Sequence, residues 1–241
     1  MKSNIKVGMP HLNYNGLDPI WLLKTLGDNH WSLLKDVKSL NQENQRLYAS
    51  FFACEIDYNK GQNFFEENDI ITLESKIFKF NSQIYRSMHS VTGNQNTASV
   101  TMDSIFVKKD KTSGNLVKDE PVSSGKNIDS VNTVFLEEHK KIKKDLVDLD
   151  PTQFNKLMFS PETYFNGVKI LYCANYFNLS LLNEYVTFGK ILNPVKKIKM
   201  FFFKNISEHD DVYGYTKCID NIYQTILMSN NKPISFCITT R

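Results

Sequence analysis

Three small or polar residues, Gly8, His11 and Asn13, directly precede the point where an amphipathic helix is expected to begin at Asp18-Pro19. The start of a helix presents unpaired backbone N–H groups, which suit an oxyanion or a phosphate. Gly8 allows the backbone to approach such a ligand closely. We therefore interpret this stretch as the rim of an acyl-thioester pocket, with His11 as a candidate catalytic residue and Gly8 and Asn13 as candidate substrate-binding residues. A capping loop in which His11 is only structural explains the same residues.

Further candidates for substrate binding lie elsewhere in the chain. Asn166 and Gly167 stand before the second expected helix and either present amides to a ligand or form only a tight turn. Asn205, shortly before the strand expected at 211–219, is a further candidate. His89 falls in an expected strand, where a histidine satisfied by its neighbours is the commoner case, and His30 occupies an apolar helical face and is expected in the core.

These candidates must be positioned by regular elements, and the first half of the chain predicts one helix followed by four strands. Asp18-Pro19 is a good helix start, and Leu22, Leu26 and Leu33 follow helical spacing. Gly27-Asp28 either lies inside this helix or ends one short helix and caps the next. The expected strands, supported by alternating apolar residues, are 47–56, 69–80, 84–91 and 98–109.

The second half repeats this order of elements. It predicts a helix at 168–186 and strands at 195–206, 211–219, 223–229 and 233–241. Short segments of the two halves also resemble each other, for example WSLLKDV at 31–37 and LSLLNEYV at 179–186. The expected organisation is a first unit at 1–109, a polar linker or excursion at 110–150 and a second unit at 151–241.

One helix followed by antiparallel strands, repeated once, favours an α+β double hot-dog fold. In that arrangement each sheet wraps its helix, and the two sheets pair edge to edge, which buries both helices and removes two exposed sheet edges. Two separate α+β domains are the alternative.

The composition limits the class of protein. The chain has 241 residues, 41% of them hydrophobic, which is enough for a buried core. A net charge of +3 gives no argument for nucleic acid, and no apolar run approaches the roughly 20 residues of a membrane span. The four cysteines form no C-x-x-C pair, so neither a metal site nor a disulfide framework is indicated. No signal peptide is recognised, and the expected location is the reducing cytoplasm.

Several motifs, in order, carry a family resemblance over nearly the whole chain except 110–150. GMPHL, GLDPIWLLKTLGDNHWSLL, RLYASFFACEI, TMDSIFVKK, YFNGVKILYCANYFNLSLLNEY and KPISFCITTR together resemble the family of the leinamycin-biosynthesis bifunctional acyltransferase/decarboxylase, and more closely its uncharacterised relatives in polyketide-type gene clusters. The resemblance implies a double hot-dog enzyme of secondary metabolism. Such an enzyme takes malonyl- or methylmalonyl-type thioesters and passes the acyl group to an acyl carrier protein.

The resemblance also implies a catalytic tyrosine. The family's proposed residue lies in a Tyr-x-x-Phe run that opens a strand after the first helix, and here that run is YASF, which points to Tyr48. A tyrosine has an ordinary pKa of about 10, so Tyr48 would need strong activation to act as a nucleophile and none to act as a hydrogen-bond donor. We favour Tyr48 as donor or acid. A strand tyrosine with a satisfied hydroxyl is the structural alternative.

Other functions on the same fold stay open. A thioesterase or dehydratase would use a helix carboxylate such as Asp36 or Glu184, although an exposed carboxylate near a helix end is the commoner case. A non-catalytic module would bind an acidic carrier protein through the lysine clusters at 139–144 and 194–199. The expected partners are an acyl carrier protein and acyl-coenzyme A. We expect no permanently bound cofactor or metal, a coenzyme A or phosphopantetheine thioester as substrate, and a monomer or a homodimer.

Overall fold

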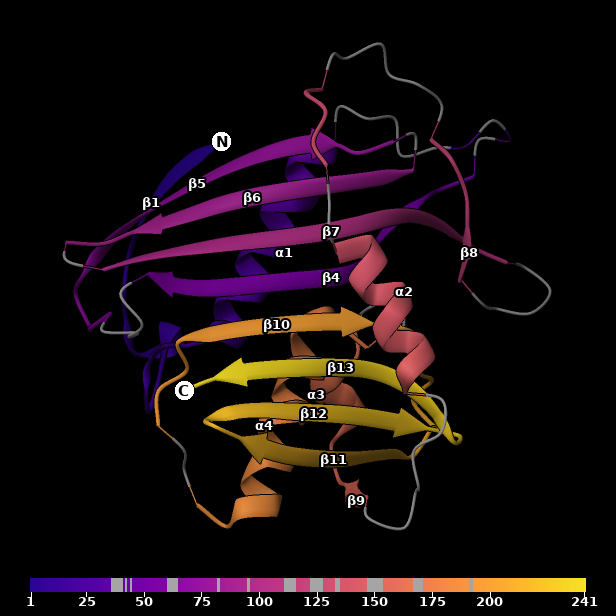
Figure 1. Cartoon of the computed structure of the whole chain (residues 1–241). Helices are drawn as coiled ribbons and strands as arrows, with labels where there is room; N and C mark the ends of the chain where they lie inside the picture. The colour runs from indigo at the N-terminus through magenta and orange to yellow at the C-terminus, as the bar shows by residue number, and fades with distance from the viewer. Residues whose placement is uncertain are drawn as a thin grey trace.

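The computed structural model describes residues 1–35, 41, 43, 45–59, 65–81, 83–94, 96–110, 116–121, 128–132, 135–146, 154–166, 171–190 and 193–241. Within these residues, eleven strands form one continuous antiparallel sheet with two long helices on one face and a shorter helix on the other (Figure 1).

The first unit contains one central helix and five strands of the sheet. The strands follow the spatial order β1-β5-β6-β7-β4. The elements are β1 (Lys2–Lys6), η1 (Met9–His11), the small hairpin of β2 (Leu12–Asn13) and β3 (Gly16–Leu17), α1 (Pro19–Leu34), β4 (Tyr48–Asn59), β5 (Ile70–Lys79), β6 (Ile84–Thr92) and β7 (Thr97–Lys109).

The second unit repeats this arrangement, with the order β9-β11-β12-β13-β10 from its outer edge inward. Its elements are β9 (Asn155–Leu157), α3 (Pro161–Tyr164), α4 (Cys173–Phe188), β10 (Lys197–Phe202), β11 (Val212–Ile219), β12 (Ile222–Ser229) and β13 (Lys232–Thr240). The two units meet where β4 pairs with β10, so the double hot-dog fold expected from the repeat is confirmed.

The pairing at this junction defines which residues are equivalent in the two units. Cys54 on β4 pairs with Met200 on β10. Met102 on β7 pairs with Cys54, and Cys237 on β13 pairs with Met200. Met102 and Cys237 therefore hold equivalent positions in the two units.

Helix α1 runs without a break, so the alternative in which Gly27-Asp28 divides it is wrong. Both carboxylate oxygens of Asp18 cap its start, accepting the N–H groups of Ile20 at 3.0 Å and Trp21 at 3.3 Å. Gly27 is a packing residue instead. A Cβ at this position would clash with the hydroxyl of Tyr172, which comes directly before α4. The absence of a side chain therefore allows the segment before α4 to approach α1.

Helices α1 and α4 pack on the inner face of the sheet, and the main core lies between them and the strands (Figure 1). Its buried members include Leu22, Leu26, Ile56, Phe177 and Ile198. The structure places the start of α4 at Cys173, later than the expected 168, whereas residues 167–170 lie outside the described part of the chain.

A bulge in β4 changes which of its side chains face this core. Phe51 pairs with Ser104 and Ala53 pairs with Asp103, so Phe52 is an extra residue in the strand. Before the bulge, Leu47 and Ala49 face inward; after it, Ile56 and Tyr58 do. The alternation of the strand therefore shifts by one residue at its middle.

The outer face of the sheet carries α2 (Phe135–Asp145), which crosses the junction of the two units, and β8 (Leu116–Lys118) pairs with β7. His139 of α2 makes a 2.8 Å hydrogen bond with the carbonyl of Phe202, and Glu138 makes a 2.5 Å ion pair with Lys199. Part of the expected excursion at 110–150 is thus regular structure packed on the sheet.

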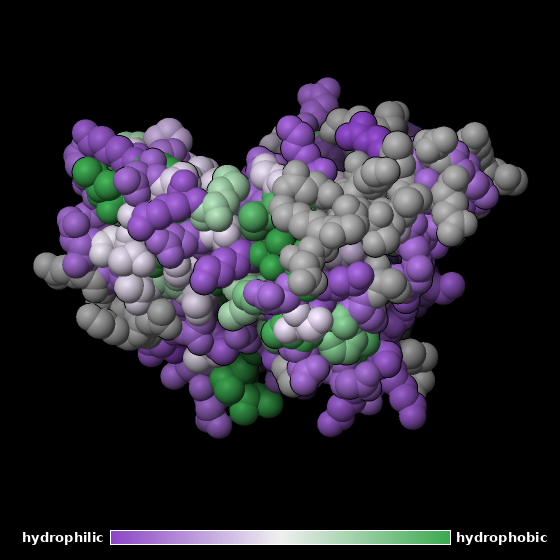
Figure 2. All heavy atoms as spheres, turned by 90° about the horizontal axis from the view of Figure 1, so that it is seen from above, coloured by the Kyte–Doolittle hydropathy of each residue, from purple (hydrophilic) through white to green (hydrophobic). Residues whose placement is uncertain are grey.

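The molecular surface seen from above in Figure 2 is mostly hydrophilic, and among its coloured residues the apolar ones lie in small separate groups. No helix in the described ranges combines the length and apolar character needed to cross a bilayer.

Candidate active site

A small cleft with a cavity volume of about 40 Å³ opens where the two units meet, beside the start of α1. The residues that line it come from the β2–β3 hairpin, α1, the end of β4, the middle of α4, the approach to β10 and the end of β13: Asn13, Asn15, Pro19, Tyr58, Leu181, Val195 and Arg241. The cleft is therefore built from both halves of the repeat, and neither half can form it alone.

The loop before α1 contributes the rim of this cleft. The side-chain oxygen of Asn13 accepts the N–H of Asn15 at 2.8 Å, and Gly16, with φ of 107°, turns the chain in a conformation that favours glycine. Asn13 and Asn15 both line the cleft, and the role of Asn13 in substrate binding stays a prediction.

His11 and Gly8 form a compact turn next to this rim. The N–H of Gly8 donates to His11 Nδ1 at 3.0 Å, and the N–H of His11 donates to the carbonyl of Gly8 at 2.9 Å. The imidazole packs on Trp21 with ring centroids 4.5 Å apart. Because Nδ1 accepts a hydrogen bond, the proton of a neutral His11 resides on Nε2. The catalytic role of His11 stays a prediction.

Tyr58 is the most distinctive residue in the cleft. Its side chain is 1% exposed, and its hydroxyl has no hydrogen-bond partner among the described residues. Burial, followed by the negative charge of Asp18, raises the pKa of Tyr58 far above its ordinary value. The hydroxyl is therefore neutral and keeps an unused donor, and a buried donor without a partner costs about 1–3 kcal/mol.

Arg241, which lines the same cleft as Tyr58, forms a buried ion pair with Glu184. One Nη of Arg241 lies 2.6 Å from Glu184 Oε2, and the hydroxyl of Thr239 donates to Glu184 Oε1 at 2.8 Å. Glu184 is 1% exposed, so the expectation of an exposed carboxylate near a helix end is wrong. Burial raises the pKa of Glu184, while Arg241 and Thr239 act in the opposite direction by stabilising the carboxylate.

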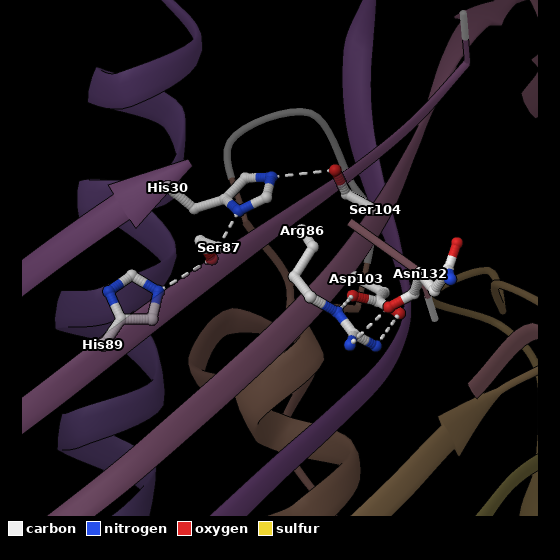
Figure 3. A network of polar contacts seen from close by, with 7 residues as sticks. All are labelled: His30, Arg86, Ser87, His89, Asp103, Ser104 and Asn132. Carbon is white, nitrogen blue, oxygen red and sulfur yellow. Dashed lines mark hydrogen bonds and ion pairs between the residues drawn. The ribbon is translucent and has the colours of Figure 1, made fainter. Parts of the chain in front are cut away.

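A second polar group fills the interior of the first unit (Figure 3). The two ring nitrogens of His30 contact the hydroxyls of Ser87 at 2.7 Å and Ser104 at 2.8 Å. Those of His89 contact Ser75 and Ser87, both at 2.7 Å. Burial lowers the pKa of His30 to about 3, with a smaller contribution from His89, and lowers that of His89 to about 4.

Both histidines are thus neutral and have all ring nitrogens engaged. His30 is a core residue, as expected. His89 lies between β5 and β7 rather than along the cleft, and its proposed role in substrate binding stays a prediction.

Tyr48 lies at the opposite end of β4 from Tyr58, about 30 Å away at the rise of an extended strand. Its neighbours Leu47 and Ala49 face the inner core, so the alternation of the strand places Tyr48 on the outer face. The guanidinium of Arg46 lies 5.4 Å from its ring centroid. The structure therefore does not bring Tyr48 together with His11 or Asn13.

The remaining candidates belong to the second unit. Asn205 accepts a hydrogen bond from the hydroxyl of Tyr176 at 3.2 Å, which fixes the loop after β10 on α4. Asn166 is exposed, and Gly167 lies outside the described residues. Neither Asn166 nor Asn205 lines the cleft.

Sequence reasoning missed Tyr58 and Arg241. Tyr58 falls two residues beyond the expected strand 47–56, and its inward direction depends on the bulge at Phe52. Arg241 is separated from Glu184 by 57 residues and gave no local signal. No group of three or more metal-ligating side chains occurs within the described ranges.

Comparisons with known proteins agree with the fold. No protein-family model and no curated protein matches the chain. The 12:0-ACP thioesterase from Umbellularia californica is similar in structure, with a TM-score of 0.71 and 7% identity over 100% of this chain and 96% of that one. An acyl-ACP thioesterase from Bacteroides thetaiotaomicron has a TM-score of 0.69 and 7% identity, again over 100% of this chain and 96% of that one. A MaoC-like dehydratase from Phytophthora capsici has a TM-score of 0.52 and 8% identity, over 80% of this chain and 72% of that one. At such identities the likeness shows the fold, and the chain has the double hot-dog fold.

Proposed function

We propose that this protein is an enzyme that acts on acyl thioesters, and that the cleft between its two units holds the thioester group. The observation that carries this proposal is the unpartnered hydroxyl of Tyr58, buried at the wall of a cleft to which both units contribute. A neutral donor in a site shielded from water stabilises an oxygen that gains negative charge during the reaction. A thioester carbonyl is such an oxygen.

The reaction that fits this donor best is decarboxylation with acyl transfer. In a malonyl- or methylmalonyl-type thioester, the bond between the α-carbon and the carboxylate breaks, carbon dioxide leaves, and the electron pair moves onto the thioester carbonyl as an enolate. A proton is then added at the α-carbon. Attack of a carrier-protein thiol on the carbonyl carbon gives the new thioester and releases coenzyme A as its thiol. Both steps place negative charge on the oxygen beside Tyr58.

The residues of the cleft agree with a donor rather than a base. Among the described residues that line it there is neither a histidine nor a carboxylate. The resemblance of the chain to the acyltransferase/decarboxylase family supports the same reaction and supplies the expectation of a secondary-metabolic role.

A thioesterase is the second candidate. The observation that favours it is the buried carboxylate of Glu184 on the central helix of the second unit, paired with the cleft residue Arg241, together with the structural likeness to two acyl-ACP thioesterases. Hydrolysis would require Glu184 to activate water. Both of its oxygens are engaged, one by Thr239 and one by Arg241, so that role requires one of these bonds to open.

An acyl carrier protein is the proposed partner for acyl transfer. Four lysines of α2, Lys140, Lys141, Lys143 and Lys144, are exposed on the outer face of the molecule and present positive charge to an acidic protein.

The test is intact-mass and product analysis of the purified protein with malonyl- and methylmalonyl-coenzyme A, with and without a holo carrier protein. Carbon dioxide release with acyl loading of the carrier supports decarboxylative transfer, loading alone indicates a plain acyltransferase, and free acid indicates a thioesterase. No conversion of these or of simple acyl thioesters would overturn the proposal.

A further inference from the structure

Three contacts hold the guanidinium of Arg241 in place. One Nη donates to the carbonyl of Asn193, the other pairs with Glu184, and the ring of Tyr223 lies 5.6 Å from the guanidinium carbon. The remaining donor, Nε–H, is buried and has no partner among the described residues. The guanidinium is thus fixed in orientation, with one unused donor on a side chain that lines the cleft.

We propose that Arg241 donates this Nε–H to the same thioester oxygen as Tyr58, forming a two-donor oxyanion hole, and that Glu184 is the positioning residue that holds Arg241 in place. This inference rests on the proposed function and adds to it the second catalytic donor and the residue that orients it.

The charges around the cleft indicate an oxygen that is neutral in the bound substrate. Glu184 balances the charge of Arg241, and the carboxylate of Asp18 is close enough to raise the pKa of Tyr58. A substrate carboxylate buried against these groups would meet two anions and only one cation. A carbonyl oxygen brings no charge and acquires it only as the reaction proceeds. The two donors therefore favour the transition state over the bound substrate, which is the condition for catalysis.

The first unit shows that the fold does not require this ion pair. Phe106 lies four residues after Met102, and Arg241 lies four residues after Cys237. Because Met102 and Cys237 are equivalent, Phe106 and Arg241 hold corresponding positions in the two units. Phe106 is 1% exposed and packs edge-on against Tyr85. The same position is thus filled by an aromatic ring in one unit and by a buried arginine in the other. Since a buried ion pair is often no more stable than an apolar replacement, its presence at the cleft indicates a role in function.

The test compares Arg241→Lys, Glu184→Gln and the double variant with wild type, measuring kcat and KM on the thioester that the protein converts. Lysine keeps a charge beside Glu184 but lacks the fixed Nε–H. We expect Arg241→Lys to lower kcat about 100-fold with KM nearly unchanged, as for loss of one oxyanion-hole donor. Glu184→Gln should also lower kcat in the wild-type background, and should have little further effect in Arg241→Lys, because it acts through Arg241. Lys156→Gln, which removes an exposed ion pair with Asp211 in the same unit, is the matched control and should leave kcat unchanged.

A binding measurement keeps the inference testable if these variants do not fold. Wild-type protein is titrated with two unreactive substrate analogues, a ketone in which CH2 replaces the thioester sulfur and a thioether that lacks the carbonyl. Two donors aimed at the carbonyl predict about tenfold tighter binding of the ketone.

The outcomes separate the two proposals. If Tyr58→Phe impairs the conversion of a thioester and Arg241→Lys does not, the role of Arg241 is overturned and the proposed function stands. A change confined to KM, or a Glu184→Gln effect that persists in the Arg241→Lys background, would also overturn it, as would equal binding of ketone and thioether. No conversion of any thioester by wild type would overturn both.

Discussion

His30 and Glu184 occupy the same place in the two units of this protein. Each lies on the central helix of its unit, four residues before the end of a 16-residue helix, and each contacts a hydroxyl on the last strand of its unit. His30 meets Ser104 on β7 at 2.8 Å, and Glu184 meets Thr239 on β13, also at 2.8 Å. One duplicated position thus carries a neutral, fully bonded imidazole in one unit and a carboxylate paired with Arg241 in the other. The carboxylate at the second of these positions holds Arg241, which lines the cleft.

The buried histidines predict a loss of stability in acid. His30 and His89 have pKa values of about 3 and about 4 in the folded protein, against about 6.5 in an unfolded chain. Below pH 6.5 the unfolded chain therefore binds protons that the folded one does not. Their stabilising contribution is complete above pH 6.5 and falls with pH, by about 1.4 kcal/mol per pH unit for each histidine. Urea unfolding at several pH values between 4.5 and 7.5 measures this slope.

The dependence of the unfolding free energy on pH is tested with His89→Gln, and His209→Gln is the control. His89→Gln removes one titrating group and should reduce the slope by about 1.4 kcal/mol per pH unit. His209 has a side chain that is 86% exposed, so its replacement should leave the slope unchanged. Equal slopes in all three proteins would contradict the burial of neutral His89.

Gly27→Ala should destabilise the contact between the two halves. The new Cβ would clash with the hydroxyl of Tyr172, and overpacking of this kind costs about 1–3 kcal/mol, partly offset by the better helix propensity of alanine. Chemical unfolding of the single and double variants tests the clash. Tyr172→Phe removes the hydroxyl and should restore most of the stability of Gly27→Ala. Additive losses in the double variant would show that the two residues do not meet.

Asp103→Asn should destabilise the protein by about 3–5 kcal/mol. Asp103 is fully buried and accepts two hydrogen bonds from Arg86, at 2.7 and 2.8 Å (Figure 3). Its neutralisation removes the opposite charge next to a guanidinium that lies 4.8 Å from the ring of Phe135 on α2. Asp211→Asn, which breaks the exposed pair with Lys156, should cost no more than about 1 kcal/mol. The free energies of unfolding of the two variants, measured side by side, decide whether burial controls the difference.

The lysines of α2 predict salt-sensitive binding of an acidic carrier protein. Replacing Lys143 and Lys144 by glutamine should weaken binding and reduce its dependence on ionic strength, because both side chains are exposed. Surface plasmon resonance or fluorescence anisotropy with a holo carrier protein, at low and moderate salt, provides the measurement. Lys2→Gln at the far edge of the sheet is the control. Loss of binding in Lys2→Gln alone would place the docking surface elsewhere.

The repeat in the sequence predicted the fold because the order of helix and strands can be recognised over long segments, without knowing individual contacts. A helix followed by alternating strands, twice, leaves few ways to bury both helices, and the pairing of β4 with β10 is the one expected. The start of α1 at Asp18-Pro19 could also be predicted, since it depends on local capping residues.

The residues of the cleft wall meet through contacts between distant segments, which a local sequence pattern does not predict. One extra residue, Phe52, decides that Tyr58 faces inward and Tyr48 outward. The neighbour of Gly27 is Tyr172, which lies in the other unit. Arg241 and Glu184 meet only because β13 runs beside α4. Each of these relationships follows from strand register or from packing between distant segments.

The most direct test of the central claim compares Tyr58→Phe with Tyr48→Phe on the thioester that wild type converts. The two variants remove the same hydroxyl from the two ends of one strand. The cleft assigned here predicts that Tyr58→Phe lowers kcat about 100-fold, with KM little changed, and that Tyr48→Phe stays within a fewfold of wild type. Full activity of Tyr58→Phe together with an inactive Tyr48→Phe would contradict the account and move the active site to the outer end of β4.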